Sequence, residues 1–378
     1  MKLMNSNKTV LITAGGTGGH IFPALAVAKL LAPEYDLLWV GAKGGIENKI
    51  VTENNIDFTA INISGLRKNG LKRMALMPFI LLRAFYQAFL IILKSRADVI
   101  VGFGGYATFP VCLVGCILRI PVIIHEQNSV PGLTNKILAK IVDRVLVAFP
   151  NVLPSKHTKL VGNPVREDIL AVIPPEPRYS NRNGGLNILV IGGSLGAKIF
   201  NEEFPKIFAE ILDDKPDHIA TITHQIGRGD IKEVREIYKT NGFCVDEEQR
   251  VKSQRMPVIN ISSFIDNMAD VYHKTDLIIC RSGASTVSEI CAVGLAAVFI
   301  PYPYAVDNHQ LYNAKPLADI HAAEMILQSE LAGHKLADII FSLERKDCQL
   351  MAENIRKLAI RDSTTQIKDT IINYIVSS

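Results

Sequence analysis

A glycine-rich turn between an apolar strand and an apolar helix occurs in both halves of the chain, and this repeat constrains the fold more than any other feature. In the first half the run VLIT leads into AGGTGGH, and in the second half the run LVI leads into GGSLGA. The matching glycines, Gly15 and Gly192, are 177 positions apart. A second matched pair, DVIVGFGG from Asp98 and DLIICRSG from Asp276, is 178 positions apart. Two pairs at nearly one offset predict two similar domains rather than one large sheet.

Apolar strands alternate with helices throughout both halves, and glycine-rich turns separate them. This order predicts the α/β class, with two Rossmann-like domains whose parallel sheets are covered by helices on both faces. The crossing VGNPVR and the polar loop 174–185 place the boundary after residue 163, so the predicted domains are 1–163 and 164–364. Ligands in such sheets bind beyond the carboxyl ends of the strands, so the glycine turns of both domains are expected to line one cleft.

The two halves carry different polar side chains at corresponding positions of the repeated strand–turn–helix pattern. His20 in the first half corresponds to Ala197 in the second, and Glu289 in the second half corresponds to Val111 in the first. This difference is expected if one domain binds the donor and the other binds the acceptor of a transferred group. We therefore interpret the chain as a two-domain enzyme.

The composition excludes several other classes of protein. The chain has 378 residues, enough for two domains, and with 48% hydrophobic and 21% charged residues it is globular rather than disordered. A net charge of +4, with one Trp and no aromatic–basic repeat, gives no reason to expect nucleic acid binding. None of the six cysteines forms a CxxC pair or a metal-ligand spacing, so we expect free thiols in a reducing compartment. The N-terminal run MKLMNSNKTVLIT lacks the apolar core of a signal peptide, which favours a cytoplasmic protein.

Neither glycine turn matches a common nucleotide-binding fingerprint. A dinucleotide loop requires G-x-G-x-x-G and an acidic residue at the end of the next strand. The first turn has Ile21 at the last glycine position, and the next strand ends in WVGA. The second turn, GGSLGAKI, lacks the Gly-Lys-Ser/Thr ending of a P-loop. NAD chemistry and ATP hydrolysis are therefore disfavoured, and turns that allow close backbone approach to a diphosphate remain.

The segment 276–294 (DLIICRSGASTVSEICAVG) predicts a buried strand, a tight turn and a helix. The free N–H groups and the positive dipole end of such a helix point at one place, where a phosphate group would bind. Glu289 lies one helical turn after Ser285, so a single ligand could meet a hydroxyl, N–H groups and a carboxylate. The alternative is that residues 286–289 (TVSE) form a capping box that only closes this helix.

Seven motifs occur in one order, and together they resemble the MurG family of peptidoglycan glycosyltransferases over almost the whole chain. The motifs are GGTGGH (15–20), GGY (104–106), HEQN (125–128), GNPVR (162–166), GGS (192–194), FID (264–266) and RSGASTVSE (281–289). Each motif alone is weak evidence, but the ordered set is strong. The family transfers GlcNAc from UDP-GlcNAc to the 4-hydroxyl of MurNAc in undecaprenyl-pyrophosphoryl-MurNAc-pentapeptide (lipid I), which forms lipid II.

The resemblance implies the two-domain GT-B fold, inversion at the anomeric carbon of the sugar, and neither a metal ion nor another cofactor in the site. The chain agrees in having no Asp-x-Asp at the end of a strand in a glycine-turn position. Helix N-termini and hydroxyl or N–H donors would stabilise the departing UDP instead of a cation. The resemblance also implies that a C-terminal helix, about residues 365–378, joins the first domain.

The donor site implied by the resemblance lies in the second half. The diphosphate would be bound by Ser194, Ala284, Ser285, Thr286, Val287 and Ser288. Arg166 would reach the same donor, and Glu289 would accept hydrogen bonds from the ribose hydroxyls. Ile265 would meet the uracil edge, and Gln310 would hold the GlcNAc hydroxyls. The run DNHQ (307–310) departs here from relatives with a second Gln before the last position, which leaves the role of His309 open.

The acceptor site implied by the resemblance lies in the first half. Family positions near the transferring sugar and phosphates correspond to Thr17, Gly18, Gly19 and Asn128. We expect His20 to be the general base for the MurNAc 4-hydroxyl, because an imidazole with a pKa of about 6.5 can accept that proton near neutral pH. The alternatives are that His20 only caps the following helix or orients the loop, and that Glu126 is the base. Glu126 could equally bond the His20 ring or a loop amide, and His125 is expected to be a core histidine.

The segment 71–96 (LKRMALMPFILLRAFYQAFLIILKSR) is strongly apolar and carries only basic charges. Its residues 74–93 match a bilayer-spanning helix in length, but Pro78, Arg83 and Gln87 interrupt them, and a crossover helix is required at this place. We therefore predict peripheral contact with the anionic cytoplasmic face of the inner membrane rather than a membrane span. The alternative is a buried crossover helix with a solvated basic rim.

Other functions and partners stay open at the level of sequence. A UDP-GlcNAc 2-epimerase has the same two-domain architecture but handles no lipid, and another UDP-sugar-dependent GT-B transferase is also possible. A non-catalytic UDP-sugar-binding scaffold at the membrane is disfavoured, because His20 and Glu289 are both present. Besides UDP-GlcNAc and lipid I, partners would include the membrane surface and proteins of cell-wall synthesis.

Overall fold

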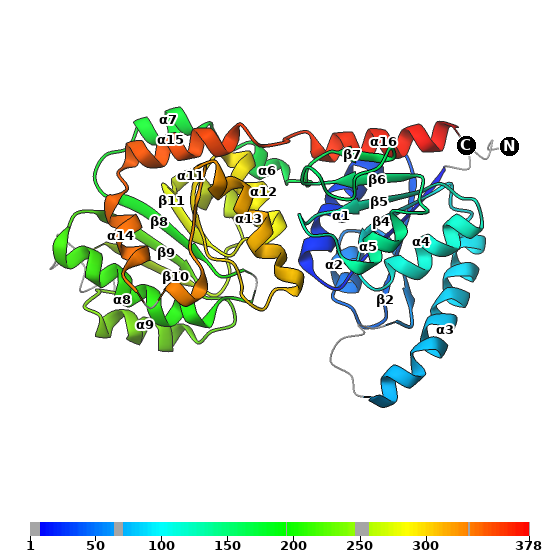
Figure 1. Ribbon diagram of the computed structural model, residues 1–378, viewed down its shortest axis with the longest axis horizontal. Helices are drawn as coiled ribbons and strands as arrows, with labels where there is room; N and C mark the ends of the chain where they lie inside the picture. The colour runs from blue at the N-terminus through cyan, green and yellow to red at the C-terminus, as the bar shows by residue number, and fades with distance from the viewer. Residues whose placement is uncertain (1–7, 64–70, 194, 246–256, 332, 378) are drawn as a thin grey trace. The chain divides into compact units, whose positions relative to one another are not determined.

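The computed structural model describes residues 8–63, 71–193, 195–245, 257–331 and 333–377, with side chains between 71 and 75 excepted. The chain divides into two compact units (Figure 1). The first unit is Met1–Val165 together with Ile360–Ser378, and the second is Arg166–Ala359. The sequence predicts these boundaries at 163/164 and about 364/365; in the structure the first lies two residues later and the second about five residues earlier.

The first unit is built on a sheet of seven parallel strands in the order β3-β2-β1-β4-β5-β6-β7. Its strands are β1 (Thr9–Ala14), β2 (Asp36–Ala42), β3 (Asp57–Ile61), β4 (Val99–Gly104), β5 (Val122–Glu126), β6 (Arg144–Val147) and β7 (Thr158–Leu160). The central strands β4 and β5 are buried at every position, which explains their continuous apolar sequences.

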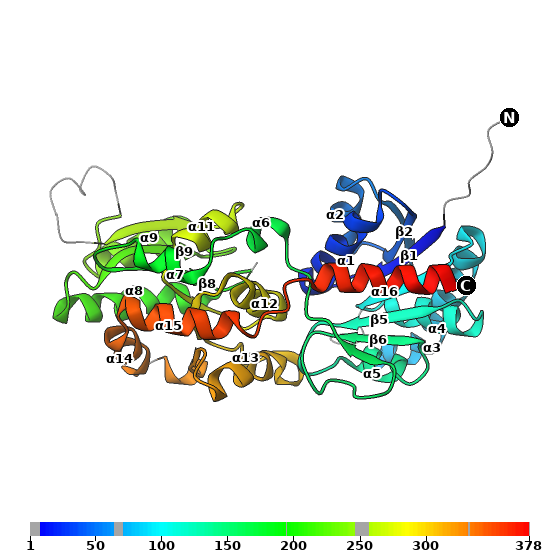
Figure 2. The same cartoon turned by 90° about the horizontal axis from the view of Figure 1, so that it is seen from above.

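Helices cover both faces of this sheet. They are α1 (Gly18–Leu31), α2 (Glu47–Glu53), α3 (Leu71–Ser95), α4 (Thr108–Ile117), α5 (Leu133–Leu138) and α16 (Ser363–Ser377). Alternate residues of β1 point to opposite faces of the sheet. Val10 and Ile12 pack with α1 and α16 on one face, and Leu11 packs with α3 and α4 on the other. The C-terminal helix α16 lies alongside α1 (Figure 2), and its Ile367 and Ile371 are fully buried in the same core.

The second unit has a six-stranded parallel sheet in the order β10-β9-β8-β11-β12-β13. Its strands are β8 (Leu186–Ile191), β9 (Ile219–Gln225), β10 (Val258–Ser262), β11 (Leu277–Cys280), β12 (Ala296–Phe299) and β13 (Glu324–Met325). Its helices are α6 (Glu167–Leu170), α7 (Pro175–Ser180), α8 (Lys198–Asp214), α9 (Ile231–Thr240), α11 (Met268–Lys274), α12 (Ala284–Val293), η1 (Val306–Asn308), α13 (His309–Asp319), η2 (Gln328–Glu330), α14 (Lys335–Ser342) and α15 (Arg345–Arg356).

The two sheets share one topology, which confirms the predicted α/β class with two Rossmann-like domains. In the first unit β1 lies between β2 and β4, and in the second unit β8 lies between β9 and β11. The strand order therefore reverses between β1 and β4 and between β8 and β11, which is where ligands bind in open parallel sheets. These four strands lead into the glycine turns that repeat in the sequence, so the repeat marks the two switch points.

Candidate active site

Two glycine turns contact each other directly at the switch point of the first unit. The backbone N–H of Gly15, after β1, donates to the carbonyl of Gly104, at the end of β4, over 3.2 Å. Gly105 has φ +97°, and a Cβ at this position would overlap the Gly15 carbonyl oxygen. Glycine is required there because the turns approach this closely.

His20 is held against these turns. Its Nδ1 lies 3.2 Å from the Gly15 carbonyl oxygen and 3.2 Å from the Thr17 hydroxyl. A carbonyl oxygen only accepts, so Nδ1 carries the proton in that contact and the neutral ring has its lone pair on Nε2. A Cβ at Gly104 would lie 2.9 Å from this Nε2, so glycine at position 104 leaves the space that the His20 ring occupies. His20 thus orients the turn, as one alternative predicted, and holds the tautomer that a base acting through Nε2 needs.

The predicted helix-capping role of His20 is not seen. Helix α1 begins at Gly18, with Thr17 as its N-cap residue, and no side chain caps it. Gly18 and Gly19 form the first helical positions, and Thr17 is exposed beside them.

Glu126 is committed to the loop that follows β5. It is only 2% exposed, and its carboxylate accepts bonds from the Asn128 N–H at 3.0 Å, the Gly132 N–H at 3.1 Å and the Asn135 side-chain amide at 2.9 Å. Burial raises the pKa of Glu126, and these hydrogen bonds counteract that rise. A proton arriving at this carboxylate would disrupt the loop that presents Asn128. The geometry therefore favours His20 over Glu126 as the base, and it supports the loop-amide alternative for Glu126.

His125 is a core histidine, as expected. It is fully buried, and its Nε2 donates to the Gly162 carbonyl over 2.9 Å. Burial lowers its pKa to about 4, so the ring is neutral at physiological pH.

Glu47 is a site residue that the sequence analysis misses. Its fully buried carboxylate accepts bonds from the Ala42 N–H at 2.8 Å and the Gly16 N–H at 3.4 Å. A Cβ at Gly15 would lie 2.5 Å from its Oε1, and one at Gly45 would overlap both carboxylate oxygens. Glu47 thereby supports the turn whose Gly15 carbonyl holds His20. No local sequence motif predicts this role, because the hydrogen-bond partners of Glu47 come from the turn after β1 and from the end of β2.

Removing this support is expected to destabilise the first unit. Glu47→Ala removes a fully buried carboxylate that accepts from the Ala42 and Gly16 N–H groups, so the free energy of unfolding should fall by about 1–3 kcal/mol. Glu47→Gln keeps an acceptor oxygen and should lose less. The matched control is Glu53→Ala on the same helix, whose exposed ion pair with Lys49 spans 3.8 Å and should change stability by less than about 0.5 kcal/mol. Equal effects of Glu47→Ala and Glu53→Ala in denaturant unfolding would contradict this role.

The second unit presents the first turn of α12 at its own switch point. Gly283 is the N-cap residue, and the first intrahelical bond runs from the Val287 N–H to its carbonyl at 2.9 Å. The N–H groups of residues 284–286 precede that bond and have no acceptor within the helix. The Ser285 hydroxyl is buried and has no hydrogen-bond partner among the described residues. These donors together suit an anionic ligand.

The alternative capping box at residues 286–289 is not formed. No side chain caps α12, and the carboxylate of Glu289 accepts instead from the hydroxyl of Tyr272, on α11, over 3.0 Å. Burial raises the pKa of Glu289 to about 7, while the nearby charge of Arg166 and the Tyr272 bond act in the opposite direction. Arg166, the exposed N-cap residue of α6, therefore lies close enough to Glu289 to meet the same ligand.

Gln310 is positioned by the turn that follows β12. Its Oε1 accepts the Tyr302 N–H at 3.0 Å, and its backbone carbonyl accepts the Ser282 hydroxyl at 2.7 Å. The Ser282 carbonyl in turn accepts from the Asn313 side chain at 3.1 Å. This network ties the start of α13 to the turn after β11, and it uses the oxygen of the Gln310 amide, so its NH₂ group is the part suited to a ligand hydroxyl.

The loop before Gln310 has an unusual backbone. Asp307 and Asn308 have φ values of +52° and +51°, a left-handed conformation that costs non-glycine residues on the order of 1 kcal/mol each. The His309 ring contacts the Val306 carbonyl at 2.8 Å through Nδ1, which closes this turn. The position of His309 therefore has a structural reason, and strain of this kind is typical of ligand-binding loops.

Arg281 is a second residue that the sequence analysis leaves without a role. Its guanidinium donates to the Ile300 and Pro301 carbonyls at 3.0 and 3.2 Å, and it lies 4.5 Å over the Phe200 ring. Burial lowers its pKa to about 10, so it stays charged at neutral pH. No carboxylate pairs with it within the described residues. It places a positive charge at the start of the turn that leads into α12.

The remaining predicted site residues belong to the donor site of the second unit. Ala284 and Val287 are buried in the first turns of α12, Thr286 and Ser288 are partly exposed there, and Ile265 is partly exposed between β10 and α11. Ser194 lies outside the described residues. In the part of the chain that the structure describes, no group of three or more His, Cys, Asp or Glu side chains is arranged to hold a metal ion.

Comparisons with known proteins agree with this architecture. Residues 10–147 match the glycosyltransferase family 28 N-terminal domain, and residues 187–371 match the family 28 C-terminal domain. A protein of Paraburkholderia phytofirmans, named UDP-N-acetylglucosamine–N-acetylmuramyl-(pentapeptide) pyrophosphoryl-undecaprenol N-acetylglucosamine transferase, is 44% identical over 95% of this chain and 93% of its own length.

Solved structures give the same result. The crystal structure of MurG from Acinetobacter baumannii matches with a TM-score of 0.82 and 36% identity, over 97% of this chain and 99% of that one. A UDP-N-acetylglucosamine 2-epimerase matches with a TM-score of 0.63 at 13% identity, over 99% and 98% of the two chains. The second likeness concerns the fold alone.

Proposed function

The chain belongs to the MurG family of glycosyltransferases, with the GT-B fold, and from that premise we propose its reaction. It transfers GlcNAc from UDP-GlcNAc to the 4-hydroxyl of MurNAc in undecaprenyl-pyrophosphoryl-MurNAc-pentapeptide, which forms lipid II for peptidoglycan. The observation that carries the proposal is the first turn of α12, where a buried Ser285 hydroxyl, without a partner among the described residues, lies one helical turn from Glu289.

The second unit binds the donor. The N–H groups of residues 284–286 and the Ser285 hydroxyl receive the diphosphate, with Val287 and Ser288 beside them. The family resemblance adds Ser194 to this set. Glu289 accepts from the ribose hydroxyls, Ile265 meets the uracil edge and the Gln310 amide donates to the GlcNAc hydroxyls. Arg166 reaches the donor from α6, and Arg281 adds a buried positive charge at the same turn.

The first unit binds the acceptor and activates its hydroxyl. Thr17, Gly18, Gly19 and Asn128 contact the sugar and phosphates, and His20 takes the proton of the 4-hydroxyl at Nε2. The oxygen then attacks the anomeric carbon from the side opposite UDP, so the configuration inverts in a single displacement. The negative charge that develops on UDP meets the α12 N-terminus and Arg281 rather than a metal ion.

Product analysis tests this reaction. The protein is incubated with UDP-GlcNAc labelled in the sugar and with a synthetic short-chain lipid I analogue. We expect the label in a disaccharide that keeps the pyrophosphate and has inverted anomeric configuration. Label found in UDP-ManNAc, or in free sugar only, would contradict the proposal.

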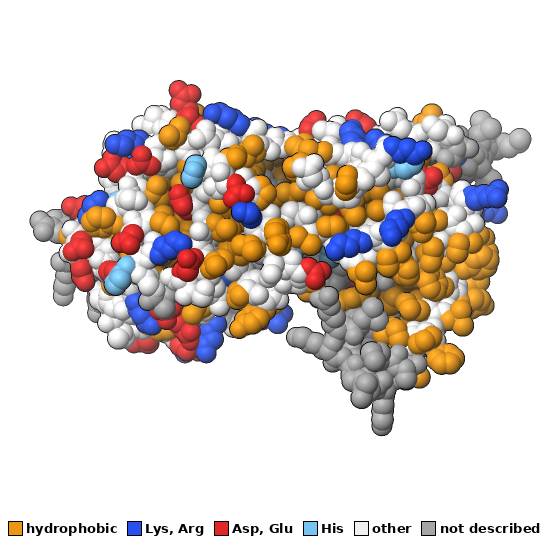
Figure 3. Space-filling model, viewed as in Figure 1, with side chains coloured by type: hydrophobic (Ala, Val, Ile, Leu, Met, Phe, Trp, Pro, Cys, Tyr) orange, Lys and Arg blue, Asp and Glu red, His pale blue; other side chains and the backbone are white. Residues whose placement is uncertain are grey.

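Helix α3 supports an approach to the membrane. Among the described residues it contains the one stretch, Leu76–Ser95, that is long and apolar enough to cross a membrane by length and composition. Ala84 and Ala88 on one of its faces are fully buried against the first unit's sheet. The other face exposes Phe79 by 70% and Leu82 by 68%, within a larger group of exposed hydrophobic side chains (Figure 3).

We propose that this outer face rests on the anionic membrane surface, where the acceptor resides. A helix with one face in the protein core and an apolar face outward suits peripheral binding. Exposed Arg83, Lys94 and Arg96 add positive charge. The side chains of Lys72 and Arg73, in the same predicted segment, lie outside the described part.

Vesicle binding tests the membrane contact. Replacing Phe79 and Leu82 together with Ser should weaken partitioning onto anionic vesicles by about 10–100-fold, since each large apolar side chain contributes roughly 1.5–3 kcal/mol when fully buried and about half of that when half-buried in the interface. Ile320→Ser, at an exposed position of the second unit, is the matched control and should change nothing. Binding that survives the double substitution and high salt would contradict peripheral attachment through α3.

A further inference from the structure

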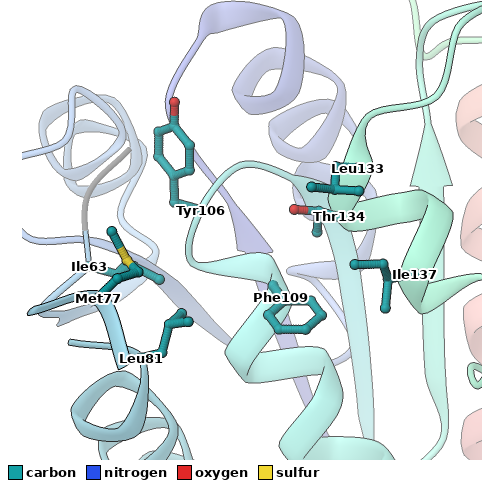
Figure 4. Close-up of a pocket in the computed structure, with 8 residues that line it drawn as sticks. All are labelled: Ile63, Met77, Leu81, Tyr106, Phe109, Leu133, Thr134 and Ile137. Atoms are coloured by element: carbon teal, nitrogen blue, oxygen red, sulfur yellow. The ribbon is translucent and has the colours of Figure 1, made fainter. Parts of the chain in front are cut away.

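An apolar pocket of about 150 Å³ lies in the first unit, and the proposed reaction does not use it (Figure 4). Met77 and Leu81 of α3 form one side, and Leu133 and Ile137 of α5 form the other. Phe109 of α4 lies between the two sides, with its ring 6.0 Å from that of Phe85. Three consecutive helices of the first unit therefore line one space.

The pocket borders two segments that adjoin residues assigned to the acceptor. Tyr106, which lines it, directly follows the Gly104-Gly105 turn that packs on Gly15 and His20. Leu133, on the other side, directly follows Gly132, whose N–H is held by Glu126 in the loop that presents Asn128. Any group in the pocket is thus next to the site of the acceptor sugar and phosphates.

The chemistry of the lining selects an apolar guest. Among the described residues no charged side chain lines the pocket, and the polar side-chain groups that line it are the hydroxyls of Tyr106 and Thr134. The rim residues Leu133 and Tyr106 are exposed, so the pocket is open to a guest from outside. An apolar cavity of about 150 Å³ is large enough to bind benzene. An isoprene unit has one carbon fewer than benzene.

We propose that this pocket binds the isoprene units next to the pyrophosphate of the acceptor. The inference rests on the proposed function, in which the acceptor is a polyprenyl pyrophosphate whose apolar chain starts directly at the phosphate. Apolar protein surface is therefore needed beside the phosphate site, and the pocket supplies it. The pocket is separate from the outward face of α3: Leu81 lines it, whereas the adjacent Leu82 points to solvent. Seating the first isoprene units fixes the distance between the bilayer surface and the reacting sugar.

Two water-soluble acceptors without vesicles or detergent test the assignment. One carries a methyl group on the pyrophosphate and the other a geranyl chain of two isoprene units. Wild-type protein should show an acceptor KM at least about tenfold lower for the geranyl compound, the effect of burying roughly two methylene groups. Ile137→Trp fills the pocket from its rim and should abolish that preference, with the donor KM and the methyl-acceptor KM unchanged.

Two further variants keep the test decisive. Ile141→Trp, an exposed apolar position just beyond α5 that does not line the pocket, should keep the preference. Leu133→Asn, at a position already 68% exposed, puts a neutral polar group at the rim and should reduce the preference without threatening the fold.

The outcomes separate this inference from the function on which it rests. Equal KM values for the two acceptors in wild-type protein would overturn the pocket assignment alone. So would a geranyl preference that survives in both Ile137→Trp and Leu133→Asn with normal donor KM. Absence of GlcNAc transfer to either acceptor would overturn the proposed function and this inference with it.

Discussion

Replacing His20 with Ala should lower kcat by about 10²–10⁴-fold while both KM values change by no more than a few-fold, the loss typical of removing a general base. The structure gives the reason. The Gly15 carbonyl holds the proton on Nδ1, so the lone pair that accepts the substrate proton is on Nε2. The ring contributes to the chemical step more than to binding, so the effect falls on kcat. Steady-state kinetics with both substrates varied measures it.

The matched comparison is Glu126→Gln. Glutamine cannot take a proton at neutral pH, and its single oxygen still accepts either from the Asn128 N–H or from the Gly132 N–H and the Asn135 amide, which bond to different oxygens of Glu126. We expect a kcat within about tenfold of wild type, far less than the ~10²–10⁴-fold loss from removing a base. Near-normal kcat in His20→Ala together with a large loss in Glu126→Gln would transfer the base role to Glu126.

Replacing Glu289 with Ala should raise the KM for UDP-GlcNAc by roughly 10–150-fold and leave the acceptor KM unchanged. Hydrogen bonds to a charged partner contribute about 1.5–3 kcal/mol, which corresponds to that range. Tyr272→Phe is the informative control, because it removes the hydroxyl that donates to Glu289 but keeps the carboxylate. Its donor KM should change much less. An unchanged donor KM in Glu289→Ala would reduce this residue to a packing partner of Tyr272.

The same carboxyl group makes donor binding depend on pH. Burial raises the pKa of Glu289 from 4.5 to about 7, so without donor it is partly protonated at neutral pH. Ribose hydroxyls donate to the ionised form, so binding favours loss of the proton, and donor affinity should increase as the pH rises from 6 to 8. Glu289→Gln should flatten this dependence in calorimetric titrations. An affinity that falls over this range in wild-type protein would contradict the assignment.

The raised pKa has the opposite consequence for stability. The folded protein favours the protonated carboxyl, so its contribution to stability is fully present below pH 4.5 and is lost as the pH rises through about 7. Bound donor offsets this loss because it stabilises the ionised form. Residues that oppose folding in their functional state are common at binding sites.

The frame of the fold was predictable because it follows from patterns close together in the sequence. Each glycine turn directly follows a buried strand, so the repeat at Gly15 and Gly192 placed both switch points and predicted two parallel sheets. His20 and Glu289 were found for the same reason, since each lies on the helix that follows such a turn.

The supporting residues were not predictable, because their partners come from distant elements. Glu47 lies in the polar run KGGIENK, and only the approach of the β1 turn shows that its carboxylate is buried. The sequence 286–289 fits a capping box with Thr286 as N-cap, but the N-cap is Gly283, three residues earlier, and Tyr272 from α11 donates to Glu289 instead. The apolar pocket likewise requires α3, α4 and α5 to come together.

The most direct test of the central claim is UDP release from UDP-GlcNAc, measured with and without a short-chain lipid I analogue in metal-free buffer with chelator. The account predicts release only when the analogue is present, coupled to formation of a disaccharide, because the sugar departs only when the activated 4-hydroxyl attacks. Equal UDP release without acceptor, or UDP-ManNAc as the product, would contradict the transferase and favour a hydrolase or an epimerase.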